Sequence, residues 1–167
     1  MILKTITPYE VEWQGQHFKC AIGRTGTKAD KQEGDGATPI GCFHLEKVYY
    51  RADRLPKPAT RLPVMTIQPD DGWCDDPKDI LYNQHVKLPY PANYEPLWRE
   101  DHVYDLLIVT SHNQNPVIPK AGSAIFIHLA RLDDQGRYCP TAGCLSLSLL
   151  DLQLILSTAK LDAVWIV

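Results

Sequence analysis

The chain has 167 residues, enough for one domain with its own core over residues 1–167. Its 44% hydrophobic and 22% charged residues are typical of a globular protein. The formal net charge is −3, and we find no basic stripe and no cationic amphipathic helix. We therefore expect neither a nucleic acid nor a membrane as partner. No apolar run approaches the length that spans a bilayer.

The chain begins with a short apolar strand, Met1–Ile6, that runs directly into Thr7 and Pro8. This start has no apolar stretch long enough for a signal-peptide core and no small-residue cleavage site. The five cysteines are an odd number, which favours free thiols in a reducing compartment. We therefore expect a cytoplasmic protein, and a periplasmic one only if the sequence is a piece of a longer chain.

Alternating hydrophobic patterns bounded by glycine, proline and asparagine predict a series of strands. These strands lie at residues 11–13, 18–22, 41–45, 106–109, 124–128 and 163–167. The middle segment, residues 51–101, is rich in proline and has no clear periodicity. A segment of this kind is either a functional loop or lid, or a surface excursion that caps the sheet. The sequence leaves both interpretations open.

One helix is predicted to begin after Ser148. Ser148 is a suitable N-cap residue, and Asp151 three positions later forms a variant of the capping box. The apolar face that follows at helical spacing belongs to the core and consists of Leu149, Leu152, Ile155, Leu156 and Ala159. The positive end of this helix favours a thiolate at Cys144 if the intervening turn directs it toward the sulfur.

His128 and Cys144 carry the clearest chemical signal. His128 ends an apolar strand, and fifteen residues separate it from Cys144, which follows the small residues Thr141, Ala142 and Gly143. A neighbouring imidazole can hold a thiol as the nucleophilic thiolate. The backbone N–H groups of Gly143 and Cys144 are then placed to bind the oxyanion of a tetrahedral intermediate. The other four cysteines lack this context: Cys20 and Cys42 are interpreted as core, Cys74 and Cys139 as loop residues.

Other chemistries fit this pattern less well. A zinc site would use His128, Cys139 and Cys144, but no fourth ligand lies nearby and there is no Cys-x-x-Cys pair. We therefore expect no metal and no cofactor. In papain-like enzymes the cysteine precedes the histidine, the reverse of the order here. Sortases need an arginine after the cysteine, and this chain has none after Arg137.

Two blocks of the sequence resemble the L,D-transpeptidase, or YkuD-domain, family. The first is Gly122–His128 followed by Thr141–Cys144. The second is Gly23–Gly26 followed by Lys31–Phe43, which contains the pattern Thr-Pro-x-Gly-x-Phe. The blocks occur in the family order, and the resemblance covers about residues 1–167. The chain departs from the usual family residues at three positions: Leu129 replaces glycine, Ala142 replaces histidine, and Ser146 replaces arginine or asparagine.

The resemblance implies a mainly β fold with a few helices: a YkuD-like β-sandwich with a long irregular middle segment and a C-terminal helix and strand. It implies that Cys144 is the nucleophile, that His128 maintains the thiolate and protonates the leaving group, and that a backbone carbonyl orients His128. Thr141, Ala142 and Gly143 shape the turn. Further candidates for substrate contacts, each of which could equally serve packing or the surface, are Ser123, Phe126, Arg24, Trp73, Asp75, Tyr82 and Asn83.

The substrate class implied is peptidoglycan stem peptides, with carbapenem β-lactams as covalent inhibitors. A cytoplasmic member would meet imported muropeptide fragments, and water would be the abundant acceptor. We therefore expect an L,D-carboxypeptidase that removes the terminal D-alanine from tetrapeptide fragments during peptidoglycan recycling. The alternatives are an L,D-transpeptidase that forms cross-links and a non-catalytic module that binds muropeptides.

Overall fold

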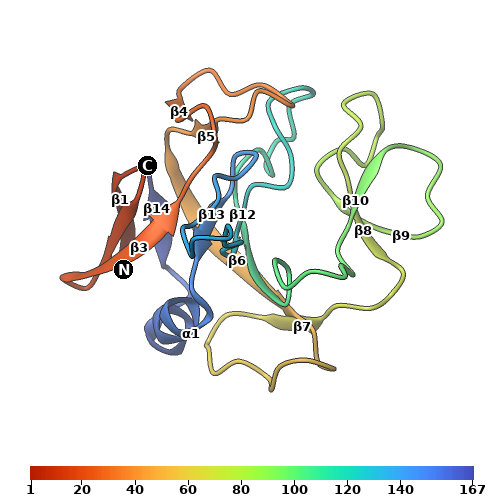
Figure 1. The fold of residues 1–167 in the computed structure, drawn as a ribbon. Helices are drawn as coiled ribbons and strands as arrows, with labels where there is room; N and C mark the ends of the chain where they lie inside the picture. The colour runs from red at the N-terminus through yellow and green to blue at the C-terminus, as the bar shows by residue number, and fades with distance from the viewer.

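β-Strands form two layers that share the strands β3 and β6 (Figure 1). The computed structural model describes residues 1–167. The strands are β1 (Ile2–Thr7), β2 (Glu10–Trp13), β3 (Gln16–Ala21), β4 (Thr27–Lys28), β5 (Thr38–Pro39), β6 (Cys42–Tyr50), β7 (Val64–Thr66), β8 (Asp71–Cys74), β9 (His85–Lys87), β10 (Tyr94–Pro96), β11 (Leu106–Thr110), β12 (Phe126–Leu129), β13 (Leu145–Leu147) and β14 (Val164–Ile166). One helix, α1 (Leu149–Thr158), precedes β14. This architecture confirms the mainly β fold with a C-terminal helix and strand.

The largest sheet closes on itself through β6. Nine strands pair in the order β11-β12-β13-β3-β2-β1-β14-β6-β7, and β6 also pairs with β11. β6 is long enough to serve both layers, because Cys42–His44 pair with β14 while Leu45–Tyr50 pair with β11. The first and last strands of the chain, β1 and β14, are parallel neighbours with Ile2 opposite Val164.

The residues of β11 and β12 are buried on both faces of the sheet. On one face, Ile108 and Ile127 belong to the main hydrophobic cluster of 22 residues between the layers. On the other face, Leu107 and Phe126 belong to a second cluster of 10 residues. This explains why 106–109 is a continuous apolar run and not an alternating one, since strands buried on both faces need apolar residues throughout.

The middle segment supplies the cover for this second face. It contains β7 and a small three-stranded sheet in the order β10-β8-β9, which stands apart from β1 and β14 in Figure 1. Ile67, Trp73 and Leu97 of this segment join the second cluster. Residues 51–101 are therefore less irregular than the sequence suggests. They cap the sheet, and the site described below shows that they also form part of a cavity wall.

The helix α1 begins and packs as predicted. The Ser148 Oγ accepts a hydrogen bond from the Asp151 N–H at 3.1 Å and donates one to the Asp151 carboxylate at 2.6 Å. Leu152, Ile155 and Leu156 are fully buried in the main cluster. The extended strand β13 separates Cys144 from the start of α1, about 10 Å at strand geometry. A helix dipole acts over about one turn, so its predicted effect on the thiol is not supported. α1 lacks the length and apolarity to cross a membrane.

Some local predictions differ from the structure. Cys42 is exposed and not part of the core, because it begins β6 with its side chain outside the packed layers. Cys74 is buried in strand β8 and does not lie in a loop. Cys20 is buried, as predicted. The predicted strand 124–128 begins only at Phe126, because Ala124 has a positive φ of 51° that interrupts the extended backbone.

Candidate active site

A cavity of about 510 Å³ brings His128 and Cys144 together. Five parts of the chain form its walls: the segment between β3 and β4, the loop between β4 and β5, the small sheet with the segment that follows it, the end of the loop before β12, and the segment from the end of β12 to the start of β13. Cys144 enters from the start of β13 and His128 from its neighbour β12, where His128 pairs with Ser146. Adjacent parallel strands therefore place both groups on one cavity.

The Cys144 thiol is held by the backbone at the start of β12 and just before it. Its Sγ donates to the Ala124 carbonyl oxygen at 3.1 Å and accepts from the Phe126 N–H at 3.3 Å. Burial raises the pKa of Cys144 to about 12; the Phe126 N–H opposes this rise and Glu95 adds to it. Burial, with only 7% of the residue exposed, therefore favours the neutral thiol at Cys144 over the thiolate.

His128 is also neutral in the resting site. Burial lowers the pKa of His128 to about 4, while the hydrogen bond to the Leu129 carbonyl oxygen works in the opposite direction. The Nδ1 atom lies 2.9 Å from that carbonyl oxygen. Since a carbonyl oxygen can only accept, Nδ1 carries the proton and Nε2 keeps its lone pair. The backbone carbonyl thus orients the imidazole with Nε2 free to take a proton.

The turn before Cys144 is fixed by the Thr141 hydroxyl. The Thr141 Oγ1 donates to the Cys144 carbonyl oxygen at 2.6 Å and accepts from the Gly143 N–H at 3.1 Å. The second of these hydrogen bonds engages the Gly143 N–H, which is one of the two N–H groups predicted for the oxyanion site. No acceptor in the protein pairs with the Cys144 N–H, which is therefore the better oxyanion donor. Ala142 lines the cavity beside it.

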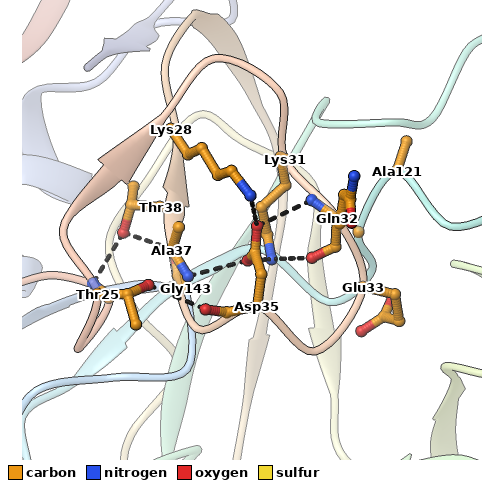
Figure 2. A network of polar contacts seen from close by, with 12 residues as sticks. Thr25, Lys28, Lys31, Gln32, Glu33, Asp35, Ala37, Thr38, Ala121 and Gly143 are labelled. Carbon is orange, nitrogen blue, oxygen red and sulfur yellow. Dashed lines mark hydrogen bonds and ion pairs between the residues drawn. The ribbon is translucent and has the colours of Figure 1, made fainter.

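Gly143 is required by the packing of the turn. Its φ is +145°, and a Cβ added there would lie 2.8 Å from the Ala37 carbonyl oxygen. The Thr38 Oγ1 donates to the Gly143 carbonyl oxygen at 2.8 Å and accepts from the Gly23 N–H at 2.8 Å. Figure 2 shows the Thr38 hydroxyl between the two backbone groups that it links. Thr38 is the first residue of the Thr-Pro-x-Gly-x-Phe pattern, and its two hydrogen bonds give that pattern a physical reason.

Asp35 organises the loop that lies against the turn (Figure 2). Its carboxylate accepts from the Lys31 Nζ at 2.5 Å, the Gln32 N–H at 2.9 Å and the Ala37 N–H at 3.0 Å. These hydrogen bonds and the charge of Lys31 hold the pKa of Asp35 well below its usual range, although desolvation works against them. The loop is thereby fixed with Lys31 and Glu33 facing the cavity.

Three of the predicted substrate residues, Arg24, Asp75 and Ser123, line the cavity. Four others lie behind its wall and contribute packing or hydrogen bonds: Trp73, Tyr82, Asn83 and Phe126, all between 1% and 2% exposed. The sequence does not distinguish the residues that line the cavity from those behind its wall, because both sets lie in irregular segments or at strand ends.

The hydrogen bonds of the buried residues show what they do instead. The Trp73 Nε1 donates to the Asn83 Oδ1 at 2.9 Å. The Tyr82 hydroxyl donates to the Glu33 carboxylate, to which the Ser123 hydroxyl also donates at 2.7 Å. Phe126 packs its ring edge-on against Trp73 with 5.0 Å between ring centroids. Trp73, Tyr82 and Phe126 therefore build the wall and do not line the cavity.

The charged lining was missed by sequence reasoning, because its residues come from segments far apart in the chain: Lys31, Glu33, Glu95, Arg99, Asp101 and Arg131. Lys31 and Arg99 are paired with acidic groups. Arg24 and Arg131 form no ion pair and no side-chain hydrogen bond, so two guanidinium groups remain available in the cavity. We know of no sequence signal that would have identified Arg131.

Four carboxylates line the same cavity: Glu33, Asp75, Glu95 and Asp101. Burial is the main cause that raises the pKa of Asp75, and Glu33 raises it further. Burial likewise raises the pKa of Glu95. The Asp75 Oδ1 is buried without a hydrogen-bond partner. The structure contains no group of three or more His, Cys, Asp or Glu side chains arranged to hold a metal ion.

Together, the β-sandwich and a cavity that joins a cysteine to a backbone-oriented histidine define the class of cysteine-dependent acyl-transfer domains. Within that class, the chain matches the family model YkuD, described as the L,D-transpeptidase catalytic domain, over residues 5–166. The protein therefore belongs to the YkuD family, whose members act on peptidoglycan peptides through a cysteine and are inhibited by carbapenems. Neither the comparison with curated proteins nor that with solved structures gave a match.

Proposed function

We propose that the protein is an L,D-carboxypeptidase that removes the terminal D-alanine from peptidoglycan tetrapeptide fragments through a Cys144 acyl-enzyme. The observation that carries this proposal is the composition of one cavity, in which Cys144 and His128 lie together with the unpaired guanidinium groups of Arg24 and Arg131. A carboxypeptidase substrate has a free terminal carboxylate beside the scissile bond. A guanidinium group binds such a carboxylate through paired hydrogen bonds.

The chemical steps follow from the resting protonation states. The His128 Nε2 takes the thiol proton as the Cys144 Sγ attacks the carbonyl carbon of the third stem residue. The Cys144 N–H donates to the oxyanion of the tetrahedral intermediate. The intermediate collapses as His128 returns the proton to the departing amine of D-alanine, which leaves a thioester. Water, deprotonated by His128, then hydrolyses the thioester and restores the thiol.

The charges of the cavity orient the fragment. Glu33, Asp75 and Glu95 line the same cavity, and a second carboxylate beside these acidic groups is unfavourable. The terminal carboxylate is therefore directed toward Arg24 or Arg131. Arg24 is adjacent to the turn Thr141–Cys144, since the backbone N–H of Arg24 donates to the Thr141 carbonyl oxygen at 2.9 Å.

We further propose a cytoplasmic location and a role in recycling wall fragments. All five cysteines are free thiols, including the exposed Cys42. Unpaired cysteines of this number are typical of proteins in a reducing compartment. In the cytoplasm the donors are soluble fragments and water is the acceptor in excess, which favours hydrolysis over cross-linking.

Incubation with a disaccharide tetrapeptide, analysed by mass spectrometry, tests the proposal. We expect release of D-alanine and a disaccharide tripeptide, and no product with Cys144→Ala. Mainly cross-linked dimers would instead establish the transpeptidase activity. Binding of the fragment without any turnover would support the non-catalytic module. A second substrate that ends in L-alanine should be inert, because the L,D bond sets the geometry at the scissile carbonyl.

A further inference from the structure

The side chain of Asn83 is fully committed to hydrogen bonds behind the cavity wall. Its Oδ1 accepts from the Trp73 Nε1 at 2.9 Å and from the Ala124 N–H at 3.0 Å. Its Nδ2 donates to the carbonyl oxygens of His112 at 3.1 Å and Asn113 at 2.8 Å. An amide has two donors and two acceptor positions, and here all four are used. Asn83 thus joins the middle segment to the loop that leads into β12.

One of these four partners, Ala124, also holds the nucleophile. Ala124 has a φ of 51°, a left-handed conformation that is strained for a non-glycine residue and persists only where the surroundings impose it. The Asn83 Oδ1 is the acceptor for the Ala124 N–H, and the Ala124 carbonyl oxygen receives the hydrogen of the Cys144 thiol at 3.1 Å. The two hydrogen bonds fix the two ends of the same strained residue.

We propose that Asn83 is a positioning residue for Cys144, which sets the direction of the Ala124 carbonyl and thereby the place of the thiol before substrate binds. The Phe126 N–H, two residues further on, donates to the same sulfur at 3.3 Å, so the backbone of 124–126 forms a cradle around it. The cradle has the correct shape only while Ala124 keeps its left-handed conformation. The middle segment therefore contributes to the chemistry without touching substrate.

Loss of the Asn83 amide would also change the protonation of the Cys144 thiol. A carbonyl acceptor stabilises only the protonated form of a thiol, so its loss favours the thiolate. A variant without the Asn83 amide should therefore have a Cys144 that ionises at lower pH but is misplaced for attack. A residue that served stability alone would not make the Cys144 thiol easier to ionise and at the same time make turnover slower.

Asn83→Gly is the informative variant. Asn83 itself has a positive φ of 59°, which glycine adopts without strain, so the substitution removes the amide and leaves the backbone unstrained. We expect the pH midpoint for iodoacetamide alkylation of Cys144, followed by peptide mass spectrometry, to fall by about one pH unit. We expect kcat for D-alanine release to fall by about tenfold or more, with KM little changed.

Gln114→Ala is the matched control. The Gln114 Nε2 donates to the backbone carbonyl oxygen of Asn83 at 2.9 Å, so this variant also removes a hydrogen bond to Asn83 but leaves the side-chain amide on Ala124. It should keep the alkylation midpoint and kcat of the unaltered protein. The proposal is overturned if Asn83→Gly changes neither property, or if Gln114→Ala reproduces the same shift.

A third measurement needs no variant and covers the case in which Asn83→Gly does not fold. Hydrogen exchange in the unaltered protein should show strong protection of the Ala124 amide, and exchange at the rate of an unstructured amide would overturn the proposal. The inference rests on Cys144 being the nucleophile of the proposed function. Alkylation and hydrogen exchange need no peptide, so they remain readable even if the carboxypeptidase proposal fails.

Discussion

Thr38→Val should weaken both the fold and the catalytic turn. Thr38 is fully buried, and its hydroxyl links the Gly23 N–H to the Gly143 carbonyl oxygen through two hydrogen bonds of 2.8 Å. Valine has nearly the same shape but neither donates nor accepts. The substitution therefore leaves one backbone donor and one backbone acceptor buried without partners.

The expected loss follows from these two orphaned groups. Each buried unpaired group costs about 1–3 kcal/mol, so the free energy of unfolding should fall by about 3 kcal/mol. For a domain of this size that lowers Tm by about 6–12 °C. Gly143 directly precedes the nucleophile, and displacement of reacting atoms by about 1 Å can cost a hundredfold in rate. We expect kcat to fall by at least about tenfold.

Urea denaturation gives the free energy, and D-alanine release gives the rate, both measured at a temperature where the variant is folded. Thr38→Ser is the matched control, because it keeps the hydroxyl and loses only a methyl group worth about 1 kcal/mol. It should retain the rate. A Thr38→Val protein within about 0.5 kcal/mol of the unaltered protein and with the same kcat would refute the reasoning.

Cys144→Ala should lose all turnover and keep its fold by circular dichroism; wild-type D-alanine release from this variant would end the assignment of the nucleophile. A carbapenem should add once to the protein by intact mass, with no addition to Cys144→Ala, whereas most penicillins should react poorly; reaction with penicillins alone would indicate another enzyme class. Stability should also depend on His128 between pH 6.5 and about 4, because its pKa is about 4 in the folded protein and about 6.5 when unfolded. The unfolded state binds the proton first as pH falls, so His128 should remove about 3 kcal/mol of stability over this range, and urea denaturation of His128→Gln should lack that part of the pH dependence.

The order His128 to Cys144, the small-residue turn and the helix after Ser148 were predictable because each depends on neighbours in sequence. A capping residue followed by an apolar face specifies a helix locally, and the structure has this helix with Ser148 as its N-cap. The strand patterns around residues 11–13 and 106–109 likewise matched β2 and β11. The family pattern around Thr38 was also visible in the sequence, but not the hydrogen bond to Gly143 that explains it.

Tertiary structure alone decided the state and surroundings of the site. Burial depends on what covers a residue, and the cover over Cys144 comes from the distant middle segment, so the sequence predicted a thiolate where packing favours a neutral thiol. The charges of Arg131 and Glu95 meet in one cavity only after the strands have paired. Asn83 was predicted to contact substrate because an exposed amide and a buried amide have the same sequence signal. The fold distinguishes them, since buried donors and acceptors must find partners, and three of the four partners of the Asn83 amide lie more than 25 positions away on the segment 112–124.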